Sequence, residues 1–78
     1  MNALNRVDLK QLRTLQCLLR EGNLSRVADQ LGVTQQAVSD QLKKLRATFN
    51  DRLFIRSGNG VTPTAYARTL GPKLDLIL

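Results

Sequence analysis

The chain has 78 residues, which is enough for one small domain. Twelve Lys and Arg residues face six Asp and Glu residues, for a net charge of +6, and His is absent. No apolar run approaches the roughly 18 residues of a membrane span, no secretory leader opens the sequence, and the single cysteine allows no internal disulfide. We therefore expect a cytoplasmic protein, without a membrane role, that binds a polyanion.

Catalytic patterns are missing as well. The carboxylates are scattered, and neither a metal-ligand spacing nor a phosphate-binding loop occurs. The sequence predicts that the chain is not an enzyme and needs no cofactor or metal.

The first expected helix runs from Leu9 to about Arg20, after a loose lead-in of residues 1–7. Asp8 suits its N-cap, and Gly22 suits the left-handed residue that ends it. The leucines fall within half of the helical wheel, so this helix is expected to lie on the core. They are Leu9, Leu12, Leu15, Leu18 and Leu19. Off this stripe, Cys17 is expected to be a small, half-buried packing residue rather than a reactive thiol.

A second, short helix is expected from Leu24 to Leu31, with Asn23 as its N-cap. Its buried side would carry Leu24, Val27, Ala28 and Leu31. Gly32 then breaks the chain, and Thr34 suits the N-cap of the next helix. Two helices joined by a three-residue turn that contains glycine are the signature of a helix-turn-helix.

The central helix, residues 35–49, has two contrasting faces. One is apolar and carries Ala37, Val38, Leu42, Leu45 and Phe49. The other is hydrophilic and carries Gln35, Gln36, Ser39, Asp40, Lys43 and Arg46. Glutamine and serine donate and accept at base edges, and cations bind phosphates. This face is typical of a helix that enters the major groove by its N-terminal half, although a merely solvated face remains the alternative.

Positive charge is concentrated in the second half of the chain. Residues 1–41 carry five cations and four anions, whereas residues 42–78 carry seven cations and two anions. Because several of these cations adjoin the polar face of the central helix, a nucleic-acid partner is favoured over a solubilising surface.

A short hairpin is expected to follow the central helix. A β-type run from Leu53 to Arg56, a tight turn over residues 57–60 and a return from Val61 to Pro63 predict a wing over residues 53–63. Phe54 is expected to pack inward, while Arg56 and the turn reach outward.

The last helix is expected from Ala65 to Leu78, with Thr64 as its N-cap. Because this helix trails from a small domain that has little of its own core left to cover, we expect its apolar seam to pack on the same helix of a second chain; folding back onto its own domain is the alternative. The seam comprises Tyr66, Leu70, Leu74, Ile77 and Leu78. Gly71-Pro72 predicts a kink or a break in this helix.

Several of these segments occur together in one known family. They include Glu21-Gly22-Asn23-Leu24-Ser25-Arg26, Val33-Thr34-Gln35, Ala37-Val38-Ser39, Leu53-Phe54, Gly60-Val61 and Pro63-Thr64. From about Asp8 to Leu78 the chain thus resembles the N-terminal DNA-binding domain of LysR-type transcriptional regulators. The resemblance implies a mainly α-helical, winged helix-turn-helix domain with a three-helix core and a two-stranded wing over residues 1–63. It further implies a linker or dimerisation helix over residues 64–78, followed by an effector-binding domain that this sequence does not include.

The same resemblance implies partners and contacts. The partners would be duplex DNA with an inverted-repeat operator, a second copy of the chain, a tetramer when full-length, and a small effector bound only by the missing domain. Base contacts would come from Gln35, Gln36, Ser39 and Asp40. Backbone contacts would come from Ser25, Arg26, Thr34, Lys43, Arg46, Arg56, Ser57 and Asn59. The chain departs from the family pattern at Gln36, often proline; at Asp40, often arginine; and at Asn59, often basic. A helical protein-interaction module is the competing hypothesis, and it predicts an apolar patch on the central helix.

Overall fold

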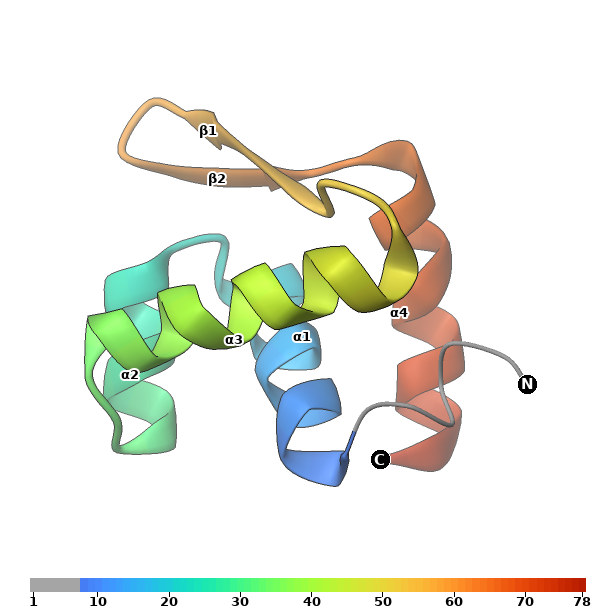
Figure 1. Ribbon diagram of the computed structural model, residues 1–78, viewed down its shortest axis with the longest axis horizontal. Coiled ribbons are helices and arrows are strands. Elements are labelled where there is room, and N and C mark those ends of the chain that lie inside the picture. The colour runs from blue at the N-terminus through green and yellow to red at the C-terminus, as the bar shows by residue number, and fades with distance from the viewer. Residues whose placement is uncertain (1–7) are drawn as a thin grey trace.

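The computed structural model describes residues 8–78, so the expected lead-in of residues 1–7 lies outside the described part of the chain. It contains helices α1 (Leu9–Glu21), α2 (Leu24–Leu31), α3 (Gln35–Phe49) and α4 (Ala65–Ile77). Strands β1 (Phe54–Ser57) and β2 (Gly60–Pro63) follow α3 and precede α4 in the chain, and they form a two-stranded antiparallel sheet. Helix α3 crosses in front of α1, the sheet lies along α3, and α4 stands beside α1 (Figure 1). This arrangement confirms the predicted winged helix-turn-helix.

Short-range hydrogen bonds set the helix boundaries. In each helix the predicted N-cap side chain accepts from the backbone N–H three residues later, which satisfies a donor that the helix itself leaves free. The four caps are Asp8, Asn23, Thr34 and Thr64, at 2.8, 3.0, 3.0 and 3.1 Å. Gly22 and Gly32 end α1 and α2 with φ of +64° and +68°, a conformation that glycine adopts without strain.

The core lies where the four helices meet the base of the wing. The inward side of α3 is buried as predicted, and Phe54 is fully buried, which confirms its inward packing. Two expected core residues are instead exposed: Leu9 by 53% and Leu31 by 37%. They stand at the first position of α1 and the last of α2 and line one hollow of roughly 290 Å³, which no side chain of residues 8–78 fills.

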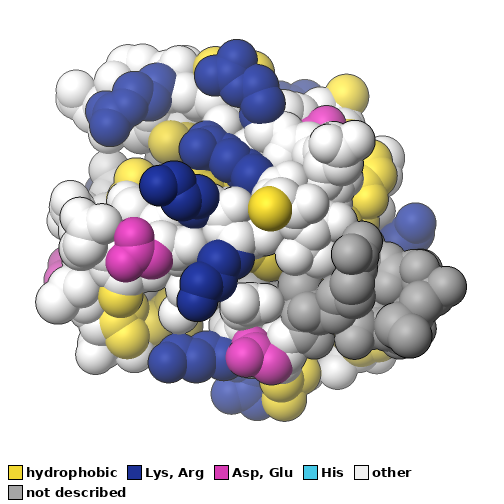
Figure 2. Space-filling model, in the orientation of Figure 1, with side chains coloured by type: hydrophobic (Ala, Val, Ile, Leu, Met, Phe, Trp, Pro, Cys, Tyr) yellow, Lys and Arg dark blue, Asp and Glu magenta, His cyan; other side chains and the backbone are white. Residues whose placement is uncertain are grey.

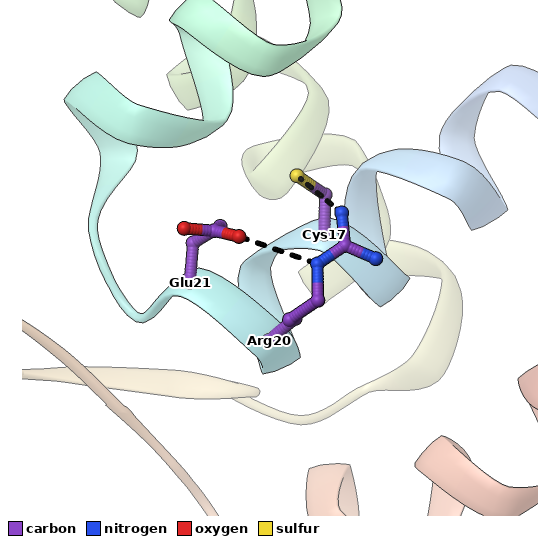
Figure 3. Close-up of polar contacts among 3 residues, drawn as sticks. All are labelled: Cys17, Arg20 and Glu21. Carbon is purple, nitrogen blue, oxygen red and sulfur yellow. Dashed lines mark hydrogen bonds and ion pairs between the residues drawn. The ribbon is translucent and has the colours of Figure 1, made fainter.

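Cys17 is a packing residue, but it is buried rather than half-buried, with 2% of its surface exposed. The guanidinium of Arg20 lies over it and donates to Sγ at 3.7 Å, while the Arg20 Nε pairs with Glu21 at 3.2 Å (Figure 3). The prediction placed Cys17 off the leucine stripe, but side chains cover α1 well beyond that stripe.

Helix α4 departs most from expectation. Leu70 and Leu74 are buried in the core of their own chain, so the prediction that they form part of a free seam is wrong. The cause is the wide leucine stripe of α1, which covers α2 and α3 on one side and α4 on the other. The close approach shows at Gly71, where an added Cβ would lie 4.0 Å from the Leu19 side chain.

Of the kink or break predicted at Gly71-Pro72, the break is wrong, because α4 runs through Pro72 as one helix. Proline removes one backbone hydrogen bond, but Pro72 is exposed, so water can reach the freed carbonyl. Leu70 and Leu74 anchor the helix to the core on either side of it. Within residues 8–78, no helix is both long and apolar enough to cross a membrane.

Candidate nucleic-acid interface

The outward face of α3 is hydrophilic from its first residue. Gln35, Gln36, Ser39, Asp40 and Lys43 are all exposed. Large hydrophobic side chains are exposed elsewhere in residues 8–78, but none of them belongs to α3. The apolar patch that a protein-interaction module predicts on this helix is therefore missing from the described chain. The face offers amide, hydroxyl and ammonium groups instead, which suit base edges and phosphates.

Two of these residues form a pair across one helical turn. Gln36 Nε2 donates to Asp40 Oδ1 at 3.0 Å. The carboxylate therefore orients the Gln36 amide and leaves its carbonyl oxygen and a second N–H free to meet a base. Asp40 thus has a local partner even without a ligand.

A second feature is the hollow between α3, α2 and the wing, with a volume of roughly 350 Å³. Ser25 at the start of α2, Gln35 at the start of α3, and Arg56 and Asn59 of the wing all line it. The fold thus brings four predicted contact residues together from three separate elements. Arg26, Thr34 and Ser57 do not line the hollow, but they are exposed.

The tip of the wing is fixed to the turn between α1 and α2. The Val61 N–H donates to the Gly22 carbonyl at 2.9 Å, and the Asn23 side chain donates to the Asn59 carbonyl at 3.2 Å. A Cβ on Gly60 would lie 2.3 Å from the Gly22 oxygen, so only glycine permits this approach. Asn23 therefore both caps α2 and holds the wing, a role that sequence reasoning missed.

The charges on this side are predominantly positive and unpaired. Lys and Arg side chains spread from the wing across α3 on the face of Figure 2, with few acidic side chains among them. In residues 8–78 the one ion pair joins Arg20 and Glu21, so Arg26, Lys43 and Arg56 keep their charges free for an outside anion. No group of three or more His, Cys, Asp or Glu in that range could hold a metal ion.

The chain is similar to known proteins in both sequence and fold. Residues 9–68 match the family described as "Bacterial regulatory helix-turn-helix protein, lysR family". The chain belongs to this LysR family. It is 42% identical over 72 residues to the uncharacterized HTH-type transcriptional regulator YbdO of Escherichia coli K12. That match covers 92% of this chain and 24% of YbdO, so the chain spans about a quarter of the relative's length.

Two solved structures share the fold of this LysR-family chain. The probable transcriptional regulator PA0477 of Pseudomonas aeruginosa superimposes with a TM-score of 0.90 at 33% identity, over 96% of this chain and 25% of that one. The CbnR_DBD–DNA complex superimposes with a TM-score of 0.84 at 25% identity, over 91% and 82% of the two chains. The second match is to a domain of the same fold with DNA bound.

One predicted backbone contact of the LysR-family domain has another use here. Arg46 was expected to face phosphate, but its Nε donates to the Arg52 carbonyl at 2.7 Å and its Nη2 to the Phe54 carbonyl at 2.9 Å. Its side chain is thus directed at the base of the wing. The helical wheel places Arg46 beside Gln35 and Ser39 and does not show that the wing lies on that flank.

The outer side of α4 keeps a smaller apolar strip. Tyr66, Ile77 and Leu78 remain exposed, and Leu76, which sequence reasoning missed, is 87% exposed. Tyr66 also stacks at a tilt on Phe49, with ring centroids 6.3 Å apart, so it joins the end of α3 to the start of α4. A second chain would have this strip available, rather than the full seam predicted from the sequence.

Proposed function

We propose that this domain binds duplex DNA sequence-specifically, with the N-terminal half of α3 in the major groove and the wing on the backbone or the minor groove. The observation that carries this proposal is the hollow that Ser25, Gln35, Arg56 and Asn59 line together. A groove bordered by a helix N-terminus and a basic hairpin suits a phosphate backbone beside a base edge. The likeness to the CbnR_DBD–DNA complex, a domain of the same fold with DNA bound, supports DNA binding.

Contacts to phosphates and contacts to base edges contribute differently to binding. Arg26, Lys43 and Arg56 would neutralise phosphates, which supplies most of the affinity and its dependence on salt. Gln35, Gln36 and Ser39 would read base edges, where a good bidentate contact is worth about 1–3 kcal/mol of discrimination. Ser25, Thr34, Ser57 and Asn59 would add uncharged hydrogen bonds to the backbone.

Asp40 has a more restricted part. A carboxylate accepts from the amino group of cytosine but is repelled by phosphate. Since Asp40 already accepts from Gln36, we propose that it acts chiefly by fixing the Gln36 amide, with a cytosine contact where the operator offers one.

We further propose that two copies act together in a cytoplasmic transcription regulator rather than an enzyme. The strip of Tyr66, Leu76, Ile77 and Leu78 would join the two α4 helices. A twofold dimer addresses an inverted repeat whose half-sites lie one helical turn, about 34 Å, or a multiple of it apart. In the full-length protein, a separate domain would bind the effector and support a tetramer.

Selection of bound sequences from a random pool of DNA duplexes tests this proposal directly. The expected result is an enriched inverted repeat that the purified protein binds more tightly than scrambled duplex at the same salt concentration. A folded protein that binds no duplex even at low ionic strength would refute DNA binding. Enrichment of a single half-site would refute the symmetric dimer and leave DNA recognition in place.

A further inference from the structure

The chain makes an unusual turn between α3 and the wing. Leu53 has φ of +64°, in the left-handed region that a branched side chain rarely adopts. The Phe54 N–H donates to the Arg52 carbonyl at 2.7 Å, which closes a tight three-residue turn around Leu53. Such a turn is strained and persists only where its surroundings hold it.

Neighbouring groups hold this turn from several directions. Asp51 Oδ2 accepts from the Leu53 N–H at 2.8 Å and from the Thr64 hydroxyl at 2.8 Å. The Leu53 carbonyl accepts from the Thr64 N–H at 2.9 Å, and the Leu53 side chain is fully buried. The turn is thereby attached to the core and to the start of α4. The Arg46 side chain adds a polar link to α3.

The Arg46 guanidinium donates to the carbonyls on both sides of Leu53, those of Arg52 and Phe54, at 2.7 and 2.9 Å. A planar fork of N–H groups reaches two carbonyl oxygens at once, which a lysine ammonium on its flexible stem does not reproduce. Arg46 stands on the flank of α3 that also carries Gln35 and Ser39. It therefore links the expected base-reading face to the first residue of β1.

We propose that Arg46 is a positioning residue that fixes the wing relative to α3, rather than a phosphate contact. Arg56 lies two residues beyond Phe54 and pairs with Val61 in the hairpin, so the base of the wing sets where its side chain points. The tip is held separately by Gly22 and Asn23. This inference deepens the proposed DNA binding and rests on it.

Binding measurements on Arg46 variants separate the two roles. Arg46→Ala is expected to weaken operator binding by about tenfold, since two charge-assisted hydrogen bonds to the wing are lost. The slope of log affinity against log salt concentration falls no further than Arg56→Ala alone lowers it, because Arg46→Ala displaces the Arg56 side chain and removes no phosphate contact of its own. Arg46→Lys keeps the positive charge but not the planar fork of N–H groups. Its affinity for the operator is therefore expected to exceed that of Arg46→Ala by no more than about threefold.

A double-mutant cycle with Arg56 gives an independent measurement. If Arg46 acts by directing Arg56, then Arg46→Ala in an Arg56→Ala background costs little further affinity. The matched control is Gln16→Ala, which removes one exposed hydrogen bond, to Asp75 at 3.0 Å, between α1 and α4. That variant is expected to bind DNA like the wild type.

The proposal is overturned if Arg46→Ala lowers the salt slope by about one unit and Arg46→Lys restores it, since that is how a phosphate contact behaves. It is also overturned if the Arg46 and Arg56 effects are independent. Circular dichroism checks folding, and if Arg46→Ala does not fold, the affinity and slope of Arg46→Lys decide. If the wild-type protein binds no duplex at all, that result instead refutes the proposed function.

Discussion

The Asn23 side-chain amide donates to the Asn59 backbone carbonyl at 3.2 Å, although 36 positions separate the two residues. The Asn23 Oδ1 accepts from the Arg26 N–H at 3.0 Å, as the cap of α2. One side chain therefore serves helix stability through its oxygen and wing placement through its nitrogen. Because these two functions use different atoms, substitutions can separate them.

We expect Asn23→Ala to lower the free energy of unfolding by about 1 kcal/mol, the usual cost of a lost N-cap, and to weaken duplex binding as well. Asn23→Ser keeps a capping oxygen, but its hydroxyl is too short to reach Asn59. It should retain stability to within a few tenths of a kcal/mol and still bind DNA less tightly. Urea unfolding and duplex titration measure the two effects, and wild-type binding by Asn23→Ser would show that the link to the wing is unimportant.

Gln35 stands at the start of α3 and lines the hollow beside Arg56, so it is the strongest candidate for reading a base. We expect Gln35→Ala to weaken binding to the selected operator by about 1–3 kcal/mol and to leave binding to random duplex nearly unchanged. Fluorescence titration against both duplexes measures the difference.

Gln30→Ala is the matched control for Gln35, because Gln30 is an exposed glutamine in the last turns of α2, away from the helix N-termini that border the hollow. Gln30→Ala should change neither the affinity for the operator nor the affinity for random duplex. Equal losses on operator and random duplex for Gln35→Ala would place Gln35 among the backbone contacts.

Much of the fold could be predicted because its boundaries are local. Each N-cap acts on a backbone group three residues away, and Gly22 and Gly32 end their helices where the pattern of apolar residues stops. The hydrophilic face of α3 could be predicted for the same reason, since its residues share one helix. Such features need no knowledge of which elements later meet.

The parts that sequence reasoning missed depend on contacts between elements. Arg46 lies in line with Gln35 and Ser39 on the helical wheel, and only the position of the wing shows that its guanidinium binds backbone carbonyls. Leu74 has the spacing of a free seam, yet α1 buries it. A helical pattern identifies an apolar stripe but does not say which chain covers it.

Arg56 is expected to contact phosphate from β1, since in residues 8–78 it has no acidic partner. Arg56→Ala should weaken binding to every duplex and lower the salt slope by about one unit, because one fewer counterion is released. The measurement is affinity for operator and random duplex at several salt concentrations.

Lys10→Ala provides the matched control for Arg56. Lys10 lies in the first turn of α1, at the opposite end of that helix from Gly22, on which the wing rests. Its removal subtracts the same charge from the protein, but the salt slope should not change. If both variants lower the slope equally, the effect reflects total charge and not a contact at Arg56.

The last helix allows a test of the dimer that leaves the domain intact. Leu74 is 1% exposed and belongs to the core, so Leu74→Ala should lower the free energy of unfolding by about 2–5 kcal/mol. Leu76 is 87% exposed, so Leu76→Asp should leave the stability of the monomer nearly unchanged. If the outer strip joins two chains, sedimentation should nevertheless show Leu76→Asp as a monomer, because an aspartate at a twofold contact buries like charges together.

The two variants therefore assign different roles to two leucines of α4: Leu74 belongs to the core, and Leu76, which the predicted seam omits, belongs to the outer strip. A monomeric Leu76→Asp that still binds a single half-site weakly would show that each domain reads DNA independently and that pairing adds affinity through the second site. If Leu76→Asp remains a dimer, the strip of Tyr66, Leu76, Ile77 and Leu78 is not the interface. In that case the exposed pair Leu9 and Leu31 becomes the apolar surface to examine next.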